Sequence, residues 1–81
     1  MAFTKEEKPA RKIIGLATVT IGDNDTLNVR RSPVKTAPVL KTVKNGEKFN
    51  VTEGSNKEFT AIIVDDVVAY VATRFVSVVM N

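Results

Sequence analysis

The stretch from Asp25 to Pro33, which reads Asp-Thr-Leu-Asn-Val-Arg-Arg-Ser-Pro, constrains the fold more than any other part of the chain. Leu27 and Val29 alternate with polar residues, and this two-residue period is typical of a strand with one buried face. Pro33 cannot donate a hydrogen bond to a neighbouring strand, so the strand must end before it. The stretch therefore predicts a short strand that runs into a loop.

Other short segments show the same strand character. The β-branched run over 13–21 predicts the first strand, with Leu16 or Ala17, Val19 and Ile21 on one face. Turn-forming residues separate it from later segments, and Asn45-Gly46 supplies a positive φ that commonly joins two strands. We expect a short strand or turn over 39–43, and further strands over 48–53, 59–64 and 67–71.

The composition is that of one small globular domain without covalent staples. The chain has 81 residues, of which 43% are hydrophobic and 26% charged, and it contains no cysteine. Stability must then come from strand packing, since no disulfide is available. Residues 1–12 are predicted to form an arm, because Pro9 leaves room for no more than one helical turn. Residues 13–81 are predicted to form the domain. The expected core comprises Leu27, Val29, Val43, Phe49, Val51, Tyr70, Val71 and Val76.

Three blocks of the sequence resemble the bacterial SH3 (SH3b) domain family. Leu-Asn-Val-Arg, followed by Ser-Pro, resembles that family's Leu-Asn-Val-Arg-Ser-Gly-Pro. The block from Pro38 to Val51 resembles its second motif, and the block from Ala69 to Val76 resembles its closing Gly-Tyr-Val-x-x-x-Tyr-Val, with Ala69 and Phe75 as replacements. The resemblance covers about residues 16–78. It implies an all-β, SH3-like barrel of about five short strands, with a tight helical turn before the last strand.

The sequence offers few residues that could support catalysis or bind a metal ion. The chain has no histidine and no cysteine, which removes the common proton shuttle, the thiol nucleophile and the usual transition-metal ligands. Asp65 and Asp66 could bind a hard cation, but adjacent strand residues point to opposite faces and no further oxygen ligand has the spacing of a calcium loop. We therefore predict that they form a solvated hairpin end. Asp23-Asn24-Asp25 could offer oxygen ligands to calcium, but the segment lacks the downstream glutamate of a calcium loop. We therefore predict that these residues form a turn. We expect no catalytic residue, cofactor or metal.

Neither membrane insertion nor secretion is predicted. The apolar stretch over 61–80 has the length of a span but contains Asp65, Asp66 and Arg74, each costing about 2.5 to 3.5 kcal/mol at a bilayer centre. The N-terminal residues carry charges where a secretory signal needs an apolar run. We therefore expect a protein that is cytoplasmic as synthesised.

Candidate binding residues are aromatic or basic. SH3-like domains usually bind ligands in a groove walled by aromatic rings, and the resemblance nominates Phe59 and Tyr70. The chain has no tryptophan, and Lys57-Glu58-Phe59 replaces the family's frequent Gly-Trp-Tyr, which disfavours glycan recognition. The arm and the loop after Arg30 are not needed to close a barrel. They supply the partner-binding candidates Lys5, Lys8, Arg11, Lys12, Arg30, Arg31 and Lys35.

Two functions follow from these features. In the first, the chain is a structural subunit that docks on a protein partner in a larger assembly, such as a phage virion decoration or accessory protein. In the second, it is a module that binds peptidoglycan in the cell wall. The missing tryptophan and the basic arm favour the first. Nucleic-acid binding ranks third, because the net charge is only +3 and no stacking aromatics interleave the basic residues.

Overall fold

The computed structural model describes residues 12–81, which form seven strands and one 3-10 turn. All but Lys12 of the predicted arm lies outside the described residues. No helix among residues 12–81 has the length and apolar character needed to span a membrane. The all-β prediction is confirmed. The elements are β1 (Ile13–Val19), β2 (Thr26–Arg30), β3 (Val39–Lys44), β4 (Lys48–Thr52), β5 (Phe59–Val64), β6 (Val67–Ala72), η2 (Thr73–Phe75) and β7 (Val76–Met80).

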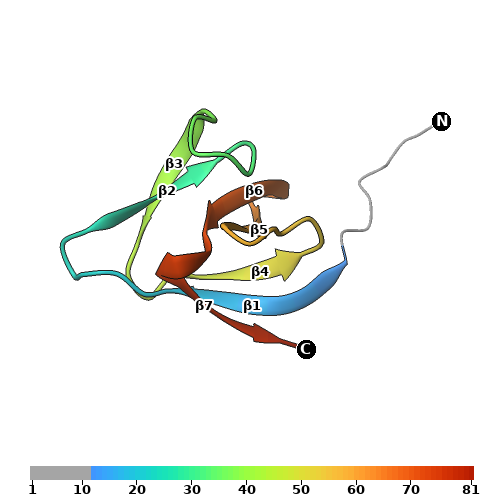
Figure 1. Ribbon diagram of the computed structural model, residues 1–81. Helices are drawn as coiled ribbons and strands as arrows, with labels where there is room; N and C mark the ends of the chain where they lie inside the picture. The colour runs from blue at the N-terminus through green and yellow to red at the C-terminus, as the bar shows by residue number, and fades with distance from the viewer. Residues whose placement is uncertain (1–11) are drawn as a thin grey trace.

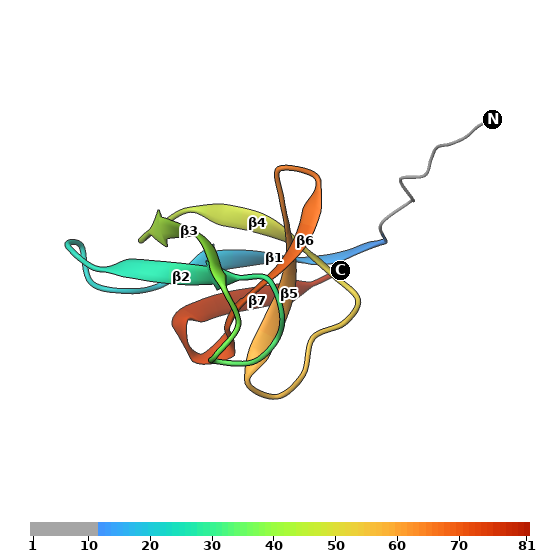
Figure 2. The same ribbon diagram turned by 90° about the horizontal axis from the view of Figure 1, so that it is seen from above.

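The strands form one antiparallel sheet in the order β3-β2-β6-β5-β4-β1-β7 (Figure 1). β2 and β3 form one hairpin, β5 and β6 form another, and β1 pairs along its length with both β4 and β7. Single residue pairs join these units: Val51 with Ile62 links β4 to β5, and Arg30 with Tyr70 links β2 to β6. The sheet changes direction at these two links and wraps around a common interior (Figures 1 and 2).

The interior is filled mainly by β-branched and small side chains. Val29, Ile62 and Ala69 are fully buried at its centre. Most of the predicted core is confirmed: Leu27, Val29, Val43, Val51 and Val71 are buried, and Phe49 and Val76 are half-buried against them.

Tyr70 does not belong to this core as predicted. It is only half-buried, because its chain neighbours Ala69 and Val71 face the interior and alternate strand residues face opposite ways. Tyr70 instead lies on the outer face opposite Ala61. A Cβ added at Gly54 would be 3.6 Å from the Tyr70 hydroxyl and 3.7 Å from the Ala61 Cβ, so Tyr70 lies beside Gly54 and the fully buried Ala61.

The expected number of strands was too low. The structure has seven rather than about five, because the segment at Val39–Lys44 pairs with β2 along most of its length and the closing block continues into β7. The first strand is shorter than predicted and ends at Val19. Beyond it, Thr20 N donates to Phe75 O at 2.9 Å and Ile21 N donates to Asn45 Oδ1 at 2.9 Å. These two amides therefore do not bond to β4 or β7.

The hairpin between β5 and β6 turns through two aspartates in the left-handed backbone region. Asp65 has φ 51° and Asp66 has φ 68°, and no other non-glycine residue among residues 12–81 has a positive φ. Two successive positive φ values suit the right-handed twist of a two-residue hairpin, but they favour Asn-Gly over two residues with a Cβ. Asp65 and Asp66 are therefore not the most stabilising residues for this turn.

Asp66→Gly should raise the free energy of unfolding by about 0.5 to 1 kcal/mol, since glycine adopts this backbone conformation without steric cost. Asp23→Gly removes the same side chain from an exposed turn without a positive φ and should be neutral or destabilising. Urea unfolding of the two variants measures the difference. Equal effects would contradict the assigned turn geometry.

Val51→Ala should lower the free energy of unfolding by about 1 to 3 kcal/mol, because it removes methyl groups from a side chain that is 2% exposed in a small core. Asn50→Ala, on the exposed face of the same strand, is the matched control and should change stability little. An unchanged unfolding midpoint for Val51→Ala would mean that the register of β4 is wrong by one residue.

Candidate binding groove

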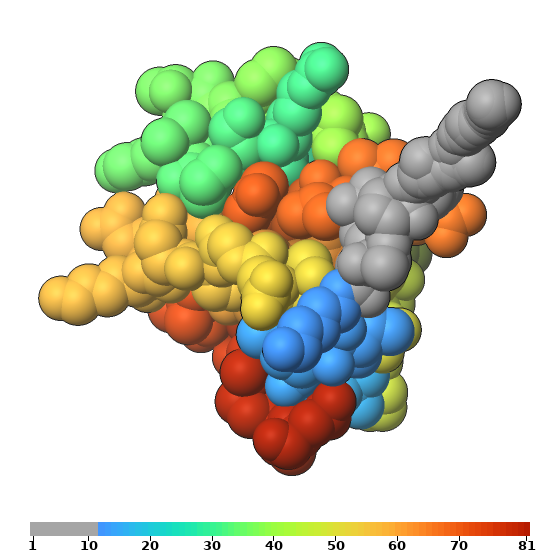
Figure 3. Space-filling view, turned by 90° about the vertical axis from the view of Figure 1, so that its right-hand side faces the viewer, coloured from blue at the N-terminus to red at the C-terminus, as the bar shows by residue number. Residues whose placement is uncertain are grey.

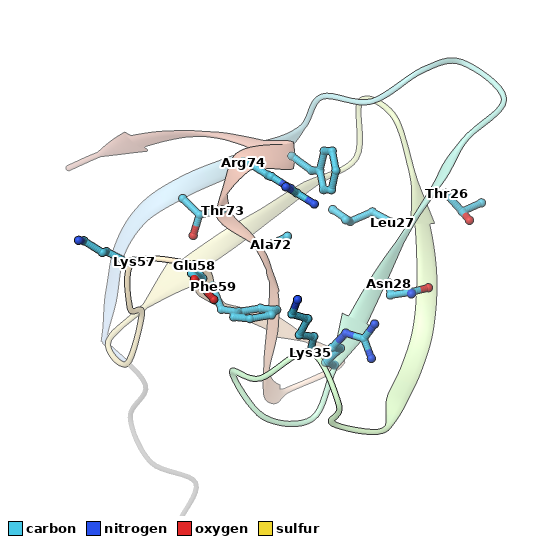
Figure 4. A pocket seen from close by; sticks show the side chains of 12 residues that line it. Thr26, Leu27, Asn28, Lys35, Lys57, Glu58, Phe59, Ala72, Thr73 and Arg74 are labelled. Atoms are coloured by element: carbon cyan, nitrogen blue, oxygen red, sulfur yellow. The ribbon is translucent and has the colours of Figure 1, made fainter.

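A groove opens where β2 and β6 separate. Arg30 and Tyr70 are the only paired residues between these strands. Continuing their antiparallel register would place Asn28 opposite Ala72 and Leu27 opposite Thr73, yet no pairing occurs there. The chain turns away at η2 instead, and Thr73 N donates to Glu58 O at 2.9 Å. A hollow of about 630 Å³ lies between the separated strands (Figure 4).

Four segments line this groove. Residues 26–28 and Arg30 line it along β2, and Lys35 comes from the loop that follows β2. Residues 57–59 enter from the start of β5, and residues 72–75 close it from the end of β6 through η2. The loop after β2 and the segment before β5, green and yellow to orange in Figure 3, project on the same flank of the molecule. The groove therefore unites segments that are distant in sequence.

The wall along the loop after β2 is fixed by backbone and side-chain hydrogen bonds. Arg30 Nη1 donates to Ala37 O at 2.9 Å, and Arg31 N donates to Pro38 O at 3.0 Å. Ala37 N donates to Val34 O at 3.1 Å, and the Ala37 side chain is buried. These contacts shape the loop that carries Lys35.

The segment before β5 is organised by two polar side chains. Asn56 Oδ1 accepts hydrogen bonds from Glu58 N at 2.9 Å and Phe59 N at 2.8 Å, while Asn56 N donates to Phe59 O at 2.8 Å. Ser55 Oγ accepts from Ala61 N at 2.8 Å. An Asn side chain that bonds the amides of following residues fixes a turn. Phe59 is thereby held at the groove.

The groove is lined by both apolar and positively charged residues. Leu27 and Phe59 are buried, and Leu27 points from β2 toward the turn that holds Arg74 (Figure 4). Phe75 is 37% exposed, and the Arg74 Cζ lies 4.8 Å from the centroid of its ring, a cation–π distance. Among residues 12–81, Glu58 is the one anionic residue that lines the groove, whereas four lining residues are cationic: Arg30, Lys35, Lys57 and Arg74.

The structure brings only some of the predicted site residues together. Phe59, Arg30 and Lys35 line the groove, whereas Tyr70, Arg31 and Lys12 do not. Lys12 has a structural contact instead, since its carbonyl accepts a hydrogen bond from Thr52 Oγ1 at 2.7 Å. The other predicted partner-binding residues, Lys5, Lys8 and Arg11, lie outside the described residues.

Sequence reasoning missed part of the groove. It did not select Lys57, Thr73, Arg74 or Phe75 as binding residues, although all four line it. A signal for three of them was present, because residues 73–75 form the tight helical turn that the closing motif predicted. A turn that ends a strand directs its side chains to the edge of the sheet.

The acidic residues behave as turn residues in the described part of the chain. Asp65 and Asp66 are exposed at the hairpin end, as predicted. Asp25 N donates to Gly22 O at 3.0 Å in the turn that contains the other aspartates. Among residues 12–81, no three His, Cys, Asp or Glu side chains gather as metal ligands would.

Comparison with protein families identifies the class of domain. The model of the bacterial SH3 domain matches residues 25–77, which is more than half of the chain. The chain therefore belongs to the bacterial SH3 domain family, a family of binding domains, and the resemblance drawn from its three motifs is confirmed. No curated protein matches the chain significantly.

Arg30→Met should lower the free energy of unfolding by about 0.5 to 1.5 kcal/mol, because it removes the hydrogen bond from Arg30 to the Ala37 carbonyl. Hydrogen exchange at the Arg31 and Ala37 amides should accelerate, since both close the same loop. Arg31→Met, at the exposed neighbouring position, removes the same charge and should leave both measurements nearly unchanged. Identical results for the two variants would show that Arg30 does not hold the loop.

Proposed function

We propose that this domain is a non-catalytic docking module that takes an extended segment of a protein partner into the groove between β2 and η2. The family match supports a binding role in general. The peptide ligand is supported by one observation, the separation of β2 from β6 beyond the pair formed by Arg30 and Tyr70.

That separation leaves one edge of β2, apart from Arg30, without a ladder partner among residues 12–81. β3 pairs with one edge of β2 from Thr26 to Arg30, whereas the edge that faces β6 is paired only at Arg30. In an antiparallel strand, alternate residues direct their N–H and C=O groups away from a given neighbour. An extended polypeptide can satisfy such groups by adding its own backbone to the edge.

Peptidoglycan binding is the second candidate, because bacterial SH3 domains often bind the cell wall. The groove favours a peptide over a glycan. Its one substantially exposed ring, Phe75, already has the Arg74 guanidinium against it, and a sugar needs an open aromatic face. Neither the family match nor the groove favours a virion over any other assembly, and the cytoplasmic site of synthesis stays a prediction.

Peptides selected from a random display library on the immobilised full-length protein test this proposal. Their addition should shift the amide resonances of β2 residues 26–30 and of η2 residues 73–75. Resonances of the β1 and β7 strands, which do not line the groove, are the internal control. The domain should also fail to sediment with purified peptidoglycan sacculi. Sedimentation with sacculi, combined with a library that yields no groove-binding peptide, would favour the wall-binding role instead.

The protein should have no hydrolase activity of its own. Incubation with purified cell wall should release no more soluble fragments than a heat-inactivated sample does, because the chain lacks histidine and cysteine and its groove holds a single carboxylate. Release above that control would overturn the non-catalytic assignment.

A further inference from the structure

We infer that the segment bound in the groove is acidic, with carboxylate side chains that meet the cations around the groove and apolar side chains that enter it. This inference rests on the proposed peptide-docking function and adds the chemical class of the partner. The inference follows from the positions of the charged and apolar side chains that line the groove.

The four cations come from both sides of the groove, although the Lys57 side chain is directed away from its centre (Figure 4). Arg30 and Lys35 belong to β2 and its loop, whereas Lys57 and Arg74 belong to the segment before β5 and to η2. Lys35, Lys57 and Arg74 are exposed, and no salt bridge links them to a carboxylate of residues 12–81. Cations gathered around a groove raise the local concentration of an acidic segment and disfavour a basic one.

The apolar groups lie between these walls. Leu27, Ala72 and Phe59 line the groove, and Phe75, which is 37% exposed, offers more apolar surface than Leu27 or Phe59. An extended peptide directs alternate side chains to opposite sides, so it can present apolar residues to these apolar side chains and carboxylates to the cations. A segment in which acidic and apolar residues alternate therefore fits this distribution.

A polypeptide fits the groove better than a nucleic acid does. Single-stranded nucleic acids bind where successive bases stack on open aromatic rings. Phe59 is 7% exposed, and the Phe75 ring already has the Arg74 guanidinium against it. The carboxylate of Glu58 also lies among the cations and would repel a continuous row of phosphates, whereas a peptide can place a neutral residue there.

The test is a titration of the full-length protein with a short peptide in which glutamates alternate with leucine and proline, followed by fluorescence anisotropy. The matched ligand is the same peptide with glutamine for every glutamate. The groove variant is Lys35→Glu with Lys57→Glu, two exposed positions in the groove. The control variant is Lys44→Glu with Lys48→Glu, two exposed positions outside the groove with the same change in net charge.

The glutamate peptide should bind at least about tenfold more tightly than its glutamine analogue, and the groove variant should lose at least about tenfold of that affinity. The control variant should stay within about twofold, and added salt should weaken only the glutamate peptide. Equal affinities for the two peptides, equal losses in the two variants, or tighter binding of single-stranded DNA than of the glutamate peptide would overturn the inference. If neither peptide binds, the inference that the partner is acidic is also overturned. If library peptides of another composition bind in the groove, the proposed docking function still holds.

Discussion

The separation of β2 from β6 is the constraint on which the binding surface depends. The strands meet at Arg30 and Tyr70, and beyond that pair β6 leaves the sheet through η2. Because Thr73 N donates to Glu58 O, this turn is tied to the segment before β5 and not to β2. One edge of β2 is thus left open, and the chemistry of the groove comes from the segments gathered beside that edge.

The small core makes this arrangement possible. Single residue pairs link β2 to β6 and β4 to β5, so few ladder hydrogen bonds hold the three parts of the sheet together. Val29 on β2, Val51 on β4 and Ile62 on β5 come from different parts and pack in one cluster. Burial of such side chains contributes on the order of 1.5 to 3 kcal/mol each. Side-chain packing, more than strand pairing, therefore fixes how the walls of the groove face each other.

Local pattern predicted the fold better than the site. Alternation at Leu27 and Val29, and at Val51, was enough to place strands and most of the core, because inward residues must be apolar whatever the topology is. Tyr70 is half-buried and outside the core, which the sequence could not predict because the apolar composition of β6 does not show which of its residues face inward. The groove depends on Arg74 lying across from Lys35, and only the tertiary fold sets that arrangement. The hydrogen bond from Arg30 to the Ala37 carbonyl could not be predicted either, because it leaves no periodic pattern in the sequence.

Each surface cation contributes little alone, so recognition here depends on shape, an open strand edge and several charges acting together. The most direct measurement is the set of intermolecular nuclear Overhauser effects between the full-length protein and a bound glutamate-leucine-proline peptide. Contacts from the peptide leucines to the methyl groups of Leu27 and to the rings of Phe59 and Phe75 are the predicted result. Contacts confined to the outer strands β3 or β7, with none in the groove, would contradict the account.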